Sequence, residues 1–126
     1  SFPYDYWDEE HMEGKGILSL KHLGYYAGLG SIGRNTLLCN EKYGNMIKLG
    51  AILTDAVLEP DSVQEGSFCN DHCNRCVDSC PAGAIADGRV SQMKCRPHSE
   101  VRNGRGAEIY VCNVCRKVCP HRTGKR

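Results

Sequence analysis

The chain has nine cysteines, and eight of them lie between positions 69 and 119. Four fall in the run CNDHCNRCVDSCP at residues 69–81, and three fall in the run CNVCRKVCP at residues 112–120. Both runs end in the spacing C-x-x-C-x-x-x-C-P, and Cys95 stands alone between them. Thiolates at such short spacings are ligands for soft metals, so the two runs predict a metal or cluster site.

Four thiolates must converge on each 4Fe-4S cluster, and the short spacings let one loop supply three of them. The spacing resembles that of the bacterial two-cluster ferredoxins, in which the cysteine before the proline binds the other cluster. Proline also removes a backbone donor and turns the chain away, which suits a ligand directed at a neighbouring site. We therefore predict two clusters. The first is assigned to Cys69, Cys73, Cys76 and Cys119, and the second to Cys80, Cys95, Cys112 and Cys115.

The first run departs from the common spacing because three residues, not two, separate Cys69 from Cys73. His72 in this wider loop is either an alternative or outer group of the cluster or, more simply, a solvent-facing residue. Zinc is the main competing metal because C-x-x-C pairs also bind it. A disulfide framework is a further alternative, disfavoured because such runs in a chain without a leader indicate the reducing cytosol. Cys39, far from both runs, is predicted to be a buried structural thiol.

The composition predicts a small protein with a thin core that metal clusters would reinforce. Residues 1–66 carry 5 Lys and Arg against 10 Asp and Glu, whereas residues 67–126 carry 11 against 5. Eight thiolates around two cores of about +2 each contribute about −4, so most of the basic excess balances the clusters. Without a signal leader or an apolar run of membrane-spanning length, the sequence predicts a cytoplasmic protein without membrane contact.

The N-terminal half shows mixed periodicity. Residues 1–16 have neither a helical nor a strand period and are predicted to be an extended arm. Apolar residues recur at helical spacing over residues 17–27, with Gly28 as the left-handed terminating residue. Strands at residues 36–39 and 46–54 are predicted to pair as a hairpin around a turn-rich connector.

The C-terminal half begins after a polar linker at residues 59–66. Asp87-Gly88 predicts a short hairpin with a type I′ turn, and Ser91 is expected to cap a brief helix that carries Cys95. Residues 97–107 have the composition of a surface loop, and the tail at residues 121–126 is expected to be mobile.

The fold class is therefore predicted to be α+β. A ferredoxin-like domain with two clusters at residues 67–126 follows a helix and β-hairpin at residues 1–66, the remnant of a larger cofactor-binding domain. The segment from Gly28 to Gly33 also matches G-x-G-x-x-G, but a helix precedes it, whereas the dinucleotide fingerprint requires a preceding strand. These glycines still predict a sharp bend that can approach a flat ligand closely, or else a simple helix-to-strand connection.

The segments AGLGSIGRNTLL, YGN and LGAILTD, followed by cysteines in the order four, one, three, together resemble the epoxyqueuosine reductase family. The resemblance implies an enzyme in which two 4Fe-4S clusters pass electrons to the cobalt of a cobalamin, which then reduces a modified base in tRNA. It also implies a set of contacts to the corrinoid. These are Gly28, Gly30, Ser31, Gly33, Arg34 and Asn35. The printed sequence does not include the family's longer N-terminal portion or the C-terminal repeats of some members, and Arg34 stands where lysine is common.

The predicted function is an iron-sulfur redox protein of this type, an oxidoreductase if the native protein includes the missing N-terminal region. The alternative is a stand-alone ferredoxin-like electron carrier that docks on a partner enzyme through its basic face. The expected partners are thus a redox partner protein or the missing N-terminal region. A third hypothesis is tRNA binding through Arg102, Arg105 and the basic tail.

Overall fold

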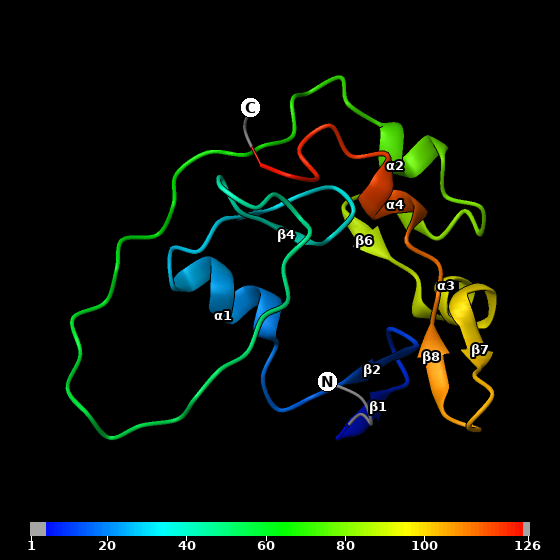
Figure 1. Cartoon of the computed structure of the whole chain (residues 1–126), viewed down its shortest axis with the longest axis horizontal. Helices are drawn as coiled ribbons and strands as arrows, with labels where there is room; N and C mark the ends of the chain where they lie inside the picture. Colours follow the sequence, from blue (N-terminus) through cyan, green and yellow to red (C-terminus); the bar gives the residue numbers. More distant parts are fainter. Residues whose placement is uncertain (1–4, 125–126) are drawn as a thin grey trace.

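Figure 1 shows the computed structural model of the chain, which describes residues 5–124. The described residues form a small α+β domain of short helices and separate two-stranded antiparallel hairpins. Few apolar side chains are buried. They are Leu38, Cys39, Cys76, Ala84 and Ile85. Because two of these five are cysteines, thiols make up an unusually large share of the small core.

The N-terminal segment is a hairpin, and the prediction of an extended arm is wrong for its described part. Strand β1 (Tyr6–Asp8) pairs with β2 (Glu13–Lys15), and Lys15 forms an ion pair with the Asp8 carboxylate. The side chain of Gln92 donates to the Gly14 carbonyl and accepts from the Gly14 N–H, at 3.1 and 3.2 Å. These bonds attach the hairpin to the helix that Gln92 begins. Residues 1–4 of the arm lie outside the described residues.

The predicted helix is confirmed as α1 (Leu20–Tyr26), which ends at Ala27 before Gly28 with a φ of +69°. The predicted hairpin is wrong. Strand β4 (Leu38–Cys39) pairs with β3 (Ser31–Ile32), which lies inside the glycine-rich segment, and residues 46–54 form no strand. Leu49 lies beside Gly24 of α1, but Ile52 is 92% exposed, so the later part of this apolar run does not pack against the core.

A long segment without helix or strand extends over residues 46–66 and includes the predicted polar linker. In Figure 1 its later part is the green trace that sweeps around one side of the molecule. All residues from 50 to 62 are exposed. The segment therefore connects the two halves of the chain without contributing to the core.

The C-terminal half begins with α2 (Arg75–Asp78), followed by the confirmed hairpin of β5 (Ile85–Ala86) and β6 (Arg89–Val90). Asp87 and Gly88 both have positive φ, as a type I′ turn requires. Helix α3 (Gln92–Ser99) is capped by Ser91, whose hydroxyl accepts from the Lys94 N–H at 3.4 Å. The predicted cap and short helix are confirmed.

Residues 97–107 are more ordered than a surface loop. They begin in α3 and continue into β7 (Glu100–Arg102), which pairs with β8 (Glu108–Tyr110). The side-chain oxygen of Asn103 accepts from the N–H groups of Arg105 and Ala107 and so closes the turn. Composition suggested a loop because this turn is rich in polar residues and glycine.

The chain ends with α4 (Val114–Lys117) and a short segment after it. Gly124 is buried against the backbone of Glu41 and Lys42, so the described part of the tail is packed, contrary to the expected mobility. Residues 125–126 lie outside the described part. Among residues 5–124, no helix is long and apolar enough to span a bilayer.

Candidate metal centre

The two cysteine runs fold alike. In each run a short helix begins after an asparagine, Asn74 for α2 and Asn113 for α4, and contains the second cysteine of a C-x-x-C pair. The two helices pack against each other, as Figure 1 shows. Residues nearly forty positions apart are thereby brought together, which the repeated spacing alone did not require.

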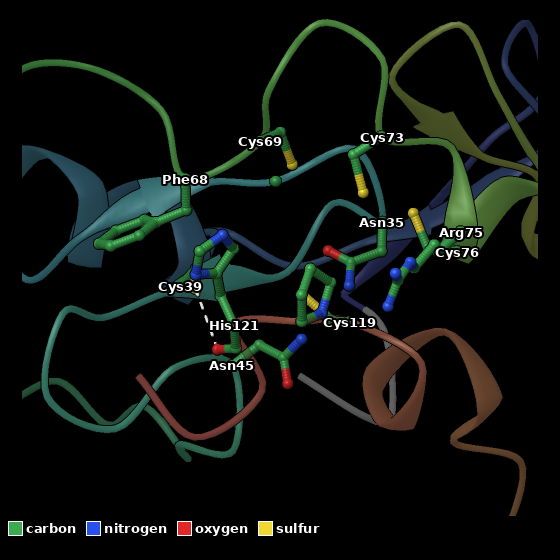
Figure 2. Close-up of a pocket in the computed structure, with 12 residues that line it drawn as sticks. Asn35, Cys39, Asn45, Phe68, Cys69, Cys73, Arg75, Cys76, Cys119 and His121 are labelled. Carbon is green, nitrogen blue, oxygen red and sulfur yellow. Dashed lines mark hydrogen bonds between the residues drawn. The ribbon is translucent and has the colours of Figure 1, made fainter. Parts of the chain in front are cut away.

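The first group of thiols lines one cavity. Figure 2 shows Cys69, Cys73 and Cys76 of the first run around this cavity together with Cys119 of the second run. These are the four residues that the spacing assigned to the first cluster. The cavity is also bordered by Gly33, where an added Cβ would lie 3.4 Å from the Cys69 sulfur.

The second group of thiols surrounds Cys115. Burial raises the pKa of the Cys115 thiol, and the nearby thiolates of Cys95, Cys112 and Cys80 raise it further. Cys80 is the last cysteine of the first run, so a residue from each run lies with the group of the other. Cys115 thus lies within electrostatic reach of the other three residues assigned to the second cluster.

Backbone donors point at thiol sulfurs in both groups. The Arg34 N–H donates to the Cys69 sulfur at 3.4 Å, and the Ala84 N–H donates to the Cys80 sulfur at 3.3 Å. Such bonds favour thiolates and are among the features that set the potentials of iron-sulfur clusters. The donor set of thiols and N–H groups fits such a cluster.

Ionisation of the buried thiols is unfavourable when no cation is near them. Burial raises the pKa of Cys76 and Cys119, and neighbouring thiolates add to the effect, while the His121 N–H and the Asn45 side chain lower the pKa of Cys119. A raised thiol pKa favours the protonated form. Metal binding at these thiols would therefore release protons and weaken as the pH falls.

Arg34 holds the wider loop of the first run. Its guanidinium donates to the Asp71 carbonyl at 3.0 Å and to the Cys73 carbonyl at 3.1 Å. It also donates to the side chain of Asn74, which precedes α2. His72, in the same loop, is exposed, which agrees with the simpler of its two predicted roles.

The neighbouring Asn35 joins the glycine segment to the second run. Its side-chain nitrogen donates to the Cys115 carbonyl at 3.2 Å, and its oxygen accepts from the Leu37 N–H. Arg34 and Asn35, which the family resemblance implies as corrinoid contacts, thus have their side-chain polar groups bonded within the chain.

The other implied corrinoid contacts also have partners within the chain. The buried hydroxyl of Ser31 accepts from the Phe68 N–H at 3.4 Å. An added Cβ at Gly28 would collide with the Ser62 carbonyl, and one at Gly30 would collide with the Cys39 carbonyl. The glycines therefore permit close approach of the chain to itself at this point.

Cys39 is buried, as predicted, but it is not remote from the cysteine runs. Its side chain lines the first cavity, and its thiol donates to the His121 carbonyl at 3.6 Å. Burial, and then the nearby thiolates of Cys119 and Cys69, raise the pKa of Cys39 to about 11. The thiol is therefore protonated at neutral pH.

Sequence reasoning missed Asn45, which lines the first cavity and is 1% exposed. Its position in the YGN segment gave no sign that it would meet the thiols.

Within residues 5–124, no three His, Cys, Asp or Glu side chains lie close enough together to hold a single metal ion.

Comparison with known proteins links the chain to one enzyme, although no protein-family model matches it. Epoxyqueuosine reductase from Lactococcus garvieae is 35% identical over 108 residues, which are 78% of this chain and 30% of that protein. Epoxyqueuosine reductase from Staphylococcus aureus is 34% identical over 119 residues, which are 86% of this chain and 31% of that protein.

Solved structures give the same relationship. Epoxyqueuosine reductase from Streptococcus thermophilus has a TM-score of 0.69 at 26% identity, covering 88% of this chain and 33% of that chain. The Bacillus subtilis enzyme has a TM-score of 0.68 at 28% identity, covering 87% and 32%. The chain is thus homologous to part of epoxyqueuosine reductase and spans about a third of the length of these relatives.

Proposed function

We propose that the chain is an iron-sulfur redox protein of the epoxyqueuosine reductase type, in which the two thiol groups hold two 4Fe-4S clusters. The observation that carries this proposal is the convergence of each group from both runs, with Cys119 among the first thiols and Cys80 among the second. Homology to part of epoxyqueuosine reductase supports the same conclusion. Clusters of this kind accept and release single electrons when bound.

The chain's own contribution is to fix the thiolates and offset their charge. Arg34 holds the loop that carries Cys69 and Cys73, and backbone N–H groups donate to sulfur in each group. The packing of α2 against α4 places Cys76 of the first group and Cys115 of the second on neighbouring helices. These residues favour rapid one-electron transfer because the thiolates and their hydrogen-bond donors need to move little when the charge of a cluster changes.

The second group offers a route to an electron acceptor. Cys95 borders an open groove of about 1010 Å³, which is also lined by Lys21, Arg89 and Lys94. These cations outnumber the two carboxylates of the lining, Glu10 and Glu13, and favour an acceptor or a partner surface that carries negative charge. An acidic partner protein at this groove is the role that the alternative function, a stand-alone electron carrier, would assign to it.

A cobalamin acceptor is the other candidate, but the residues implied as its contacts fit it poorly in this chain. Ser31, Arg34 and Asn35 use their polar groups for bonds within the chain. Titration of the cluster-loaded chain with cobalamin separates the two functions. If the corrinoid spectrum changes and the change saturates with added cobalamin, the result supports the reductase type. An unchanged spectrum instead supports the stand-alone electron carrier.

The first test of the proposal is metal content. Anaerobic reconstitution with iron and sulfide is expected to give about eight irons and eight sulfides per chain, since each cluster holds four of each. Iron and acid-labile sulfide are measured together. A chain that takes up zinc in preference, or iron without sulfide, would contradict the proposal.

The second test is the assignment of the ligand that comes from the other run. Cys119→Ala is expected to lower the iron content to about four per chain because the first group keeps only three thiols. Cys39→Ala is the matched control, since Cys39 lines the same cavity but is not an assigned ligand. It is expected to keep about eight irons. Two intact clusters in Cys119→Ala would refute the assignment.

A further inference from the structure

Asn45 is a buried amide beside the Cys119 thiol. It is 1% exposed, and neither its side-chain nitrogen nor its oxygen makes a hydrogen bond of ordinary length and angle to a described residue, although the amide is close enough to Cys119 to lower the pKa of that thiol. A buried polar group in this condition costs free energy, and folded proteins pair nearly all such groups. We therefore expect a further hydrogen-bonding group beside the amide, in the cavity that Asn45 lines.

The loop before Asn45 is built to bring the amide to the cavity. Asn40 and Gly44 exchange two backbone hydrogen bonds of 2.8 Å, which close a tight turn. Gly44 has a φ of +63°, and an added Cβ there would collide with the carbonyl of His121. Only glycine permits this approach, which sets the next residue beside the segment that carries Cys119.

The cavity that the amide lines is rich in cysteine side chains. Asn45 lines the first cavity together with the four thiols, and Figure 2 shows it there with Cys119. The other amide in the cavity, Asn35, is already bonded to Cys115 and Leu37. The acceptors that a cluster would add at this place are thiolate and sulfide sulfurs, which bind N–H donors.

We propose that the Asn45 side chain donates a hydrogen bond to the first cluster, at the Cys119 thiolate or an adjacent sulfide, and thereby raises its reduction potential. The inference rests on the proposed function, because a cluster must be present to accept the bond. A donor stabilises the more negative, reduced form over the oxidised form. The first cluster is thus easier to reduce than it would be in a cavity without this amide.

The test replaces the amide in the full chain after anaerobic loading with iron and sulfide. Asn45→Leu removes the donor with little change in volume, and its reduction equilibrium is expected to be about two- to tenfold less favourable at one cluster only. Asn45→Asp places a carboxylate at the same position and is expected to give a larger change in the same direction. A dithionite titration followed by EPR spectroscopy measures both clusters in each variant.

Asn40→Ala is the matched control. The Asn40 side chain bonds Leu29, Lys42 and Tyr43 and so supports the same loop, but it does not line the cavity. This variant is expected to titrate like the wild type. An equal shift in Asn40→Ala would mean that loop position, and not the Asn45 donor, sets the potential, and would overturn the inference.

The remaining outcomes separate the inference from the function on which it rests. A wild-type chain that binds no iron-sulfur cluster refutes the proposed function, and the inference with it. A wild-type chain with about eight irons and an Asn45→Leu variant with unchanged potentials refutes the inference alone. If Asn45→Leu does not assemble clusters, Asn45→Asp decides, because an unchanged potential there also refutes the inference.

Discussion

The Arg34 side chain bonds the part of the first run that is one residue wider than the common spacing. Its planar guanidinium reaches the carbonyls of Asp71 and Cys73 at the same time. A lysine carries the same charge but lacks the fixed fork of donors, so it cannot hold both carbonyls in the same way. The arginine and the wider loop are therefore matched to each other.

Substitution of Arg34 separates its geometry from its charge. Arg34→Lys is expected to keep the reduction potential of the first cluster but to speed loss of that cluster in air several-fold, since the loop is less restrained. Arg34→Gln is expected to lower the potential as well, because a positive charge near the cluster favours its reduced form. Absorbance decay and redox titration measure the two effects. Arg105→Lys, at an exposed position in the turn between β7 and β8, is the control, and equal decay in this variant would count against the restraint.

At the level of single residues, the sequence predicted which thiols would lie near one another, but not what supports them. Repeated C-x-x-C-x-x-x-C-P spacing indicates which cysteines can share a loop; four of these thiols line the first cavity, and Cys115 lies near the other four-ligand set's remaining thiols, while the ligand assignment itself stays a prediction. Arg34 bonds the Cys73 carbonyl and Asn45 lines the first cavity, each from more than twenty positions before the first run. Nothing in their neighbouring residues encodes that approach, which depends on tertiary contacts of Gly33 and Gly44.

At the scale of elements, the sequence predicted the helices and turns whose ends are marked by a characteristic residue. Gly28 ends α1, Asp87-Gly88 forms the turn between β5 and β6, and Ser91 caps α3. Strand pairs of two or three residues, such as β3 with β4, are too short to show a period. The apolar run at residues 46–54 misled the prediction because burial was inferred from composition, whereas the run is largely exposed.

The hairpin of β1 and β2 is expected to loosen in acid. Its ion pair with Lys15, and then the bond from the His11 N–H, hold the pKa of Asp8 well below its usual range. A depressed folded-state pKa means that the stabilisation is complete above the unfolded-state pKa of about 4 and is lost as the pH falls below it. Amide exchange in residues 6–15 should therefore accelerate between about pH 4 and pH 2. Asp8→Asn should abolish this dependence, and an identical acid response in that variant would contradict the assignment.

At the scale of the whole molecule, many bonds cross the boundary that the sequence suggested at residue 66. Arg34 bonds the first run, Asn35 bonds the second run, and Gly14 bonds Gln92 of α3. The tail packs against the loop at Glu41 and Lys42. The two parts of the chain are therefore held together by noncovalent contacts as well as by the segment at residues 46–66. This segment is largely exposed and is the part of the connection that a protease can reach.

Limited digestion tests this arrangement. Chymotrypsin is expected to cut first after Leu53 or Leu58, which are 87% and 72% exposed. The two fragments should then co-elute in gel filtration and keep their iron, because the contacts across the cut remain. Separation of the fragments would instead support two independent domains at residues 1–66 and 67–126. Mass spectrometry of the first products identifies the cut.

The packing of α2 against α4 has a consequence for the kinetics of the proposed electron transfer. Each thiol group has one member on this packed pair of helices, Cys76 on α2 and Cys115 on α4, so no hinge or linker lies between these two thiols. Exchange of an electron between the groups should therefore be insensitive to solvent viscosity. Delivery to an outside acceptor at the groove beside Cys95 requires diffusion and docking, so viscosity and salt should slow only that step.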